Sequence, residues 1–91
     1  MTPQTFHDPG GPVQAMQYTA ETADAVLAWI PADRQRILVD GTEERCLYVL
    51  NPDRIYERVW FGDWVIRDAF GWFAMRPATF QRKYERTEVQ A

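Results

Sequence analysis

An α+β fold is predicted, with an antiparallel, strongly twisted sheet of four to five strands packed against one or two helices. Two stretches carry helical signals, and the stretches between them are short apolar runs separated by turn residues. Strands and helices do not alternate as in βαβ units, which argues against a doubly wound parallel sheet. A chain of 91 residues has room for one domain.

An N-terminal arm is expected before the folded domain. Residues 1–12 contain three of the six prolines, and Phe6 is their only large apolar side chain. Chain termini of this composition are poorly ordered unless something anchors them. The sequence therefore predicts a flexible arm over 1–12 and a single α+β domain over 13–91.

A strand over 13–18 leads into the clearest helical pattern of the chain. Apolar residues then recur at i, i+3, i+4 and i+7, which places them on one face of a helix. We expect this helix over 20–30, with Thr19 as its N-cap and Pro31 ending it. The apolar face consists of Ala23, Val26, Leu27 and Ile30.

Two β-hairpins are predicted after this helix. Residues 37–39 and 45–50 are apolar runs separated by a polar turn, and the second run is apolar on both faces, as in a central strand. The stretch 54–60 has both strand-like and helix-like spacing, and a strand is favoured. Residues 64–67 and 72–75 flank a four-residue link and form the second hairpin.

A final helix is predicted over 77–86. Pro77 suits the first position of a helix, and Phe80 and Tyr84 are four residues apart, so their rings lie on one face. The opposite face is expected to be basic and solvated. It carries Gln81, Arg82, Lys83 and Arg86.

Bulk composition argues against several classes of protein. The net charge of -3 and the pI near 5.0 disfavour duplex nucleic acid as a partner, because such binding needs clustered Lys and Arg. The longest apolar run has six residues, too short for a membrane span. Cys46 is the only cysteine, so no intrachain disulfide is possible. A cytoplasmic location is expected, without contact to membrane.

No set of catalytic residues emerges from the sequence. His7 lies in the predicted arm, and Cys46 lies in a predicted central strand, where a thiol acts as a small apolar group. Glu57 and Asp63 are a conceivable acid–base pair, but a domain this small desolvates two carboxylates poorly. We expect no enzyme activity, no cofactor and no metal. The acidic turn residues Asp40, Glu43 and Glu44 lack the spacing of a calcium loop.

Aromatic side chains are the most distinctive feature of the sequence. A sheet buries only about half of such a set on its inner face, so rings at turns are candidate binding anchors. The alternative is that all of them cover a small core, with Arg stems lying over Trp rings. The cluster is Trp60, Phe61, Trp64, Phe70, Trp72 and Phe73; the candidate partner-binding residues are Trp60, Phe61 and Phe70 with the interleaved Arg58, Arg67 and Arg76.

Several short motifs together resemble a family of small, uncharacterised proteins of bacteriophages and prophages, common in phages of actinobacteria. The motifs are GDWVI at 62–66, GWF at 71–73, RPATF at 76–80, YE at 84–85, QAMQY at 14–18 and ADAVLAW at 23–29. Where members usually carry Glu-Phe-Tyr-Pro, this chain has WFAM at 72–75. The resemblance implies a phage origin and an accessory role in the host cytoplasm, and it implies no activity.

The resulting hypothesis is a small, phage-encoded protein that binds a host protein without catalysis, for host takeover or to inhibit a defence system. Two alternatives remain. One is a protein that binds single-stranded nucleic acid, with bases stacked on its aromatic rings and phosphates held by its basic side chains. The other is a homo-oligomer that buries its aromatic patch between copies. The nucleic-acid alternative uses Trp60, Phe61, Trp72 and Phe73 for stacking, and Arg58, Arg67, Arg76, Arg82 and Lys83 for phosphates.

Overall fold

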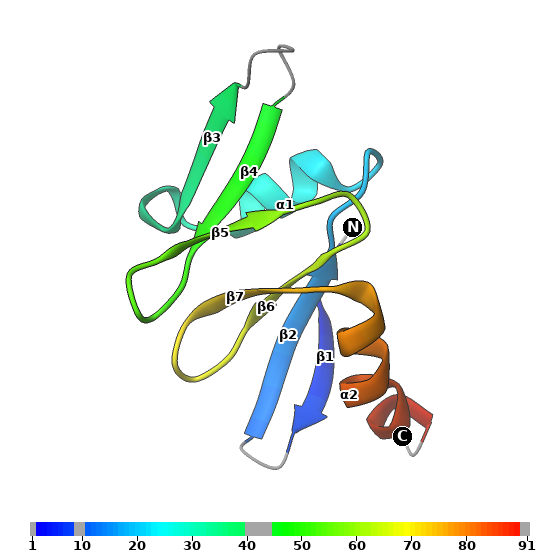
Figure 1. Ribbon diagram of the computed structural model, residues 1–91. Coiled ribbons are helices and arrows are strands. Elements are labelled where there is room, and N and C mark those ends of the chain that lie inside the picture. Colours follow the sequence, from blue (N-terminus) through cyan, green and yellow to red (C-terminus); the bar gives the residue numbers. More distant parts are fainter. Residues whose placement is uncertain (1, 9–10, 40–44, 90–91) are drawn as a thin grey trace.

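The computed structural model describes residues 2–8, 11–39 and 45–89, and it has the predicted α+β class. In this part of the chain, seven strands form two antiparallel sheets, accompanied by two α-helices and one 3-10 turn (Figure 1). The elements are β1 (Gln4–Asp8), β2 (Gly11–Gln17), α1 (Ala23–Trp29), the 3-10 turn Ala32–Arg34, β3 (Gln35–Val39), β4 (Arg45–Leu50), β5 (Tyr56–Val59), β6 (Trp64–Arg67), β7 (Trp72–Met75) and α2 (Pro77–Val89).

The strands are divided between a four-stranded sheet in the order β1-β2-β6-β7 and a three-stranded sheet in the order β3-β4-β5. The sequence predicted one sheet of four to five strands. The difference arises at β6, which pairs with β2 and not with β5, its neighbour in sequence, so that Ala15 lies opposite Ile66. Figure 1 shows β5 and β7 side by side where the two sheets meet.

The prediction of a flexible arm over 1–12 is wrong for residues 4–8, which form β1. This strand pairs antiparallel with β2, with Phe6 opposite Val13. The Phe6 ring is buried and lies edge-on to Phe80, with 5.1 Å between ring centroids. One large apolar side chain is therefore enough to anchor this segment, because it fills a gap between the sheet and α2.

Two apolar cores lie on the two faces of the four-stranded sheet. One face packs against α1 and the inner face of the three-stranded sheet, with Val26, Leu47 and Val65 at its centre. The other face packs against α2. Phe80 stacks flat on Trp64 there, with centroids 3.8 Å apart and an interplanar angle of 4°. Alternation along β6 produces this arrangement, since successive side chains point to opposite faces.

Helix α1 is shorter than predicted, because residues 20–22 form a turn. The residue at the N-cap is Thr22 and not Thr19, and its carbonyl accepts the Val26 N–H (2.9 Å). Its hydroxyl does not cap the helix: it donates to the Gln17 carbonyl (2.6 Å) and accepts from the Thr19 backbone N–H (2.8 Å). The helix ends before Pro31, as expected. The amide of Gln35 donates to the carbonyls of Leu27 and Ile30, which lack helical partners.

The remaining predicted elements are present with small shifts in their ends. The predicted bounds of β4, β6 and β7 agree with the structure, and β4 is the central strand of its sheet. Helix α2 begins at Pro77 as predicted, and Gln81, Arg82 and Lys83 are exposed on it. The turn predicted over 40–44 and the side chain of Arg86 lie outside the described part. No described helix is long and apolar enough to cross a membrane.

Candidate functional site

The turn between β5 and β6 is held by a buried carboxylate. Asp63 is 3% exposed, and its Oδ2 accepts the backbone N–H of Trp60 at 3.0 Å. The Asp63 N–H donates in return to the Trp60 carbonyl at 2.9 Å. Gly62 has a φ of 97°, a conformation that glycine adopts without a Cβ clash. The residues Phe61-Gly62-Asp63 therefore form the turn that their types predict.

This turn is also fastened to the end of β2. The Gly62 N–H donates to the Tyr18 carbonyl at 2.7 Å, and the Tyr18 N–H donates to the Asp63 carbonyl at 2.8 Å. The Gln17 side-chain amide donates to the Gly62 carbonyl at 3.0 Å. These bonds connect residues more than forty positions apart in the chain, so the turn has a fixed place on the fold.

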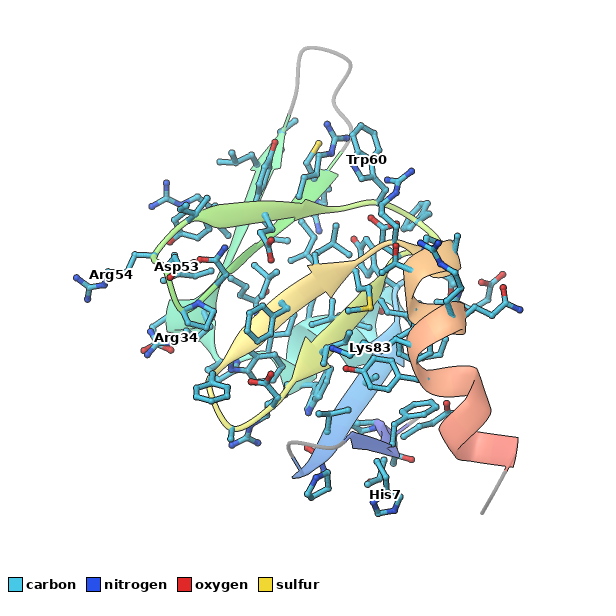
Figure 2. All side chains as sticks on the ribbon, turned by 60° about the horizontal axis from the view of Figure 1, so that its bottom comes forward. His7, Arg34, Asp53, Arg54, Trp60 and Lys83 are labelled. Atoms are coloured by element: carbon cyan, nitrogen blue, oxygen red, sulfur yellow. The ribbon has the colours of Figure 1, made fainter. Side chains whose placement is uncertain are left out.

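The turn presents two large aromatic side chains to solvent. Trp60 is 49% exposed and Phe61 is 66% exposed. The guanidinium of Arg58 lies over the Trp60 ring, with Cζ 3.5 Å from the ring centroid, and the Phe61 ring lies 5.2 Å from that of Tyr18. Each exposed ring therefore rests on a neighbour that limits its motion. Figure 2 shows Trp60 and His7 at opposite ends of the molecule.

Trp60 and Phe61 stand at the edge of a cavity of about 370 Å³, which we call the Trp60 pocket. It lies between α1 and the end of the three-stranded sheet nearest Arg45. Its walls are largely apolar, and its charged residues are Asp24, Arg45 and Arg58. The lining residues are Tyr18, Ala23, Asp24, Leu27, Ile37, Arg45, Cys46, Arg58, Val59, Trp60 and Phe61.

Two polar groups at the Trp60 pocket, the Tyr18 hydroxyl and the Arg58 Nε, are affected by burial. Burial raises the pKa of Tyr18 above its usual 10.0, and the nearby Cys46 thiol contributes in the same direction. The Arg58 Nε is buried and makes no hydrogen bond within the described residues. Such a donor costs free energy, which the contact between the guanidinium and the Trp60 ring offsets.

The six residues proposed from the sequence as partner-binding do not form one patch. Arg58, Trp60 and Phe61 come together at the Trp60 pocket. Phe70 is 82% exposed, but it lies in the turn at the opposite end of β6 (Figure 1). Arg67 is at that end as well, 5.7 Å from the ring of Trp72. The exposed Arg76 guanidinium lies 3.6 Å from Asp63 Oδ1, behind the turn.

The other three rings of the aromatic cluster are less exposed than Trp60, Phe61 and Phe70. Trp72 is buried, and its ring packs against that of Trp29 at 4.8 Å. Trp64 and Phe73 are half-buried. The burial of Trp72 removes this ring from the stacking surface predicted for nucleic acid. The expectation that about half of the rings point inward agrees with the structure.

Residues considered for catalysis serve the fold in this structure. Glu57 Oε1 accepts the backbone N–H of Ala74 at 3.0 Å, and Asp63 holds the turn described above. Cys46 is buried, and His7 is exposed on β1. Within the described ranges, no three His, Cys, Asp or Glu side chains gather closely enough to hold a metal ion.

No local pattern predicted the part of the Trp60 pocket that α1 and β3 contribute. Leu27 belongs to the apolar face of the predicted helix, and Ile37 to a predicted strand, so both were expected in the core. Ile37 lies beside Trp60 because β3 and β5 both pair with β4, and Leu27 reaches the same place from α1. The turn signal at Gly62-Asp63 is the one local feature that indicated where the rings would be exposed.

Comparison of the chain with protein-family models, with curated proteins and with solved structures gives no match. Its function is therefore inferred from its own side chains.

Proposed function

We propose that this protein is a non-catalytic binding protein that docks a partner protein at the Trp60 pocket. One observation carries the proposal: two large aromatic side chains are exposed on a hydrogen-bonded turn, at the edge of an apolar cavity. Trp and Tyr are enriched among the residues that contribute most binding energy at interfaces, together with Arg. Trp60 and its neighbour Arg58 both belong to these types.

The rigidity of the turn supports this function. The backbone at Gly62 and Asp63 is bonded to the end of β2, so Trp60 and Phe61 are held in one place before a partner arrives. A pre-organised surface loses less conformational entropy on binding than a flexible one. Exposing such rings on a mobile loop would give a weaker site for the same contact area.

The lining of the Trp60 pocket indicates the chemistry of the partner. Leu27, Val59 and Phe61 offer apolar contacts, whereas Asp24 and Arg45 are charged. A partner segment with one aliphatic or aromatic side chain, flanked by polar groups, matches this pattern. The resemblance to phage proteins makes a protein of the bacterial host the expected source of that segment.

Single-stranded nucleic acid is a second candidate, because two Arg–aromatic pairs lie on the outer face of the three-stranded sheet. Besides the Arg58–Trp60 pair, the guanidinium of Arg36 lies 4.8 Å from the Tyr56 ring. Arg36 and Arg58 both lie opposite Tyr48, so they share one face of the sheet. Bases stack on such rings, and binding of this kind weakens steeply with salt.

The test is affinity capture from bacterial lysate, with and without nuclease, followed by mass spectrometry. Three tagged chains are compared: the natural one, Trp60→Ala/Phe61→Ala, and the control Phe70→Ala. Phe70 is the more exposed ring but lies at the other end of β6. We expect one host protein in near-stoichiometric yield with the natural chain and the control, unaffected by nuclease.

With the purified partner, the double substitution is expected to weaken binding at least about tenfold, as loss of hot-spot side chains does. Equal recovery by all three chains would show that the Trp60 pocket is not the docking site. Loss of all captured material after nuclease would favour single-stranded nucleic acid. Recovery of the tagged chain alone would contradict both functions.

A further inference from the structure

Strand β3 is an open edge of the three-stranded sheet. It pairs with β4 alone, so the backbone N–H and C=O groups along its other side have no strand partner in the described part of the chain. Such an edge is a template for pairing with another strand. Three of its four exposed side chains are apolar: Ile37, Leu38 and Val39 are 37%, 46% and 62% exposed, and the fourth is Arg36.

The other strand edges differ from β3 within the described residues. The exposed side chains of β1 are polar, namely Gln4, Thr5 and His7. On β7, the Ala74 N–H already donates to Glu57, and both β4 and β5 lie against this strand. Polar side chains and covered edges are the usual protection against strand pairing. The β3 edge is not covered by another described strand, and Arg36 is the only charged side chain among its five residues.

We propose that two copies of this chain associate through their β3 edges, antiparallel around a two-fold axis at Ile37. The result is one continuous six-stranded sheet. This self-association is distinct from docking at the Trp60 pocket, although the Ile37 side chain of β3 also lines that pocket. It uses the edge of β3, whereas the docking site uses the turn after β5.

The residues of β3 are complementary to themselves in this register. An axis at Ile37, the midpoint of Gln35–Val39, pairs all five residues of the strand. Arg36 then lies opposite Leu38 of the second copy, and the two Arg36 side chains do not meet. In a parallel, in-register pair, Arg36 of one chain would lie beside Arg36 of the other, and the repulsion between the two positive charges disfavours that arrangement.

The surface area of the monomer is consistent with a second copy as the occupant. The accessible surface is 6320 Å², whereas a compact monomer of this mass exposes about 5500 Å². The excess is about 800 Å², so the molecule has surface that a second copy can cover, and the exposed apolar side chains of β3 are part of it. The molecule is correspondingly elongated, measuring 44 × 26 × 21 Å.

The first test is the mass in solution, measured by light scattering on a sizing column. We expect twice the chain mass of 10.7 kDa at high concentration and dissociation on dilution, over a range of about 1 to 300 µM that suits a small interface. Leu38→Lys is expected to stay monomeric throughout. The control Ile55→Lys changes an isoleucine that is more exposed than Leu38 (60% against 46%) and lies in the turn before β5, and it is expected to dimerise like the natural chain.

The second test probes the register of the β3–β3 pair by disulfide cross-linking. Opposed Cα atoms in an antiparallel pair lie about 4.5 to 5.5 Å apart, within the range that a disulfide spans. Ile37→Cys is therefore expected to form a covalent dimer under mild oxidation. Gln35→Cys is not, because its two copies lie about 13 Å apart in this register. The natural chain, whose only cysteine is the buried Cys46, is the control.

A natural chain that remains monomeric at every concentration would overturn the proposal. A Leu38→Lys chain that still forms a dimer would also overturn it, because the contact between copies must then lie elsewhere. Equal cross-linking of Gln35→Cys and Ile37→Cys would contradict the proposed register. Circular dichroism of each variant confirms that the fold is intact. Capture of a partner at the Trp60 pocket is read independently, so either proposal can fail alone.

Discussion

Asp63 is the residue on which the geometry of the candidate site depends most. It is buried, it accepts a backbone N–H within its own turn, and its carbonyl is bonded to β2. A sequence pattern of Phe-Gly-Asp predicts a turn, because glycine permits a positive φ and Asp bonds local backbone. The pattern does not predict that the carboxylate is buried, since that depends on the approach of β2.

Asp63→Ala is expected to lower the free energy of unfolding by about 1–3 kcal/mol, because the Trp60 N–H loses its acceptor and a buried charged group is replaced by a void. Urea denaturation measures this loss. The control Asp53→Ala removes an exposed Asp from another turn and is expected to change stability by less than about 0.5 kcal/mol. Equal effects of the two substitutions would show that the Asp63 bond does not hold the turn.

Because of Tyr18, the free energy of unfolding is expected to decrease at alkaline pH. Burial raises its pKa in the folded protein above 10.0, whereas the unfolded chain has a value of about 10. The folded state thus holds the proton more tightly, and this contribution to stability is present below about pH 10 and lost as the pH rises through the higher folded value.

Tyr18→Phe has no hydroxyl to ionise, so its stability is expected to fall less than that of the natural chain between about pH 9 and pH 11. Urea denaturation across this range measures the free energy of unfolding of both chains. The contributions of other titrating groups are the same in both and cancel in the difference. Parallel pH profiles would contradict the burial of this hydroxyl.

At the scale of elements, local patterns predicted most of the helices and strands. The hairpin of β6 and β7 has clear apolar runs and a short link, and the bounds of both strands agree with the structure. Strand β1 was missed because its only apolar anchor is Phe6, and its burial requires α2 on the same face. The division into two sheets was missed for a related reason: the pairing of β2 with β6 is a long-range contact that no local signal carries.

Helix α2 is expected to depend on Phe80 for its attachment to the sheet. The Phe80 ring is buried against Phe6, Trp64 and Tyr84. Phe80→Ala is expected to destabilise the fold by about 3–5 kcal/mol, as removal of a buried aromatic side chain does. The control Gln81→Ala lies on the exposed side of the same helix. An unchanged melting temperature of Phe80→Ala would mean that α2 does not pack on the sheet.

At the scale of the whole molecule, the candidate site exists because two sheets and α1 meet at one end. The aromatic excess around Trp60 was visible in the sequence, but the grouping of Arg58, Trp60 and Phe61 apart from Phe70 and Arg67 was not. The two groups are separated by the length of β6, because Trp60 and Phe61 lie in the turn before this strand, whereas Arg67 and Phe70 lie at or after its other end. The pocket beside Trp60 needs Leu27 from α1 and Ile37 from β3, which only the assembled fold brings together.

We expect the fold to hold Trp60 and Phe61 in place without depending on their side chains for its stability. The most direct measurement is the free energy of unfolding of Trp60→Ala/Phe61→Ala at fixed protein concentration, compared with the natural chain and with Phe80→Ala. Because both rings are about half exposed or more, we expect a loss below about 2 kcal/mol and a well-folded variant. A loss as large as that of Phe80→Ala would show that the two rings are part of the core and would contradict their assignment as binding anchors.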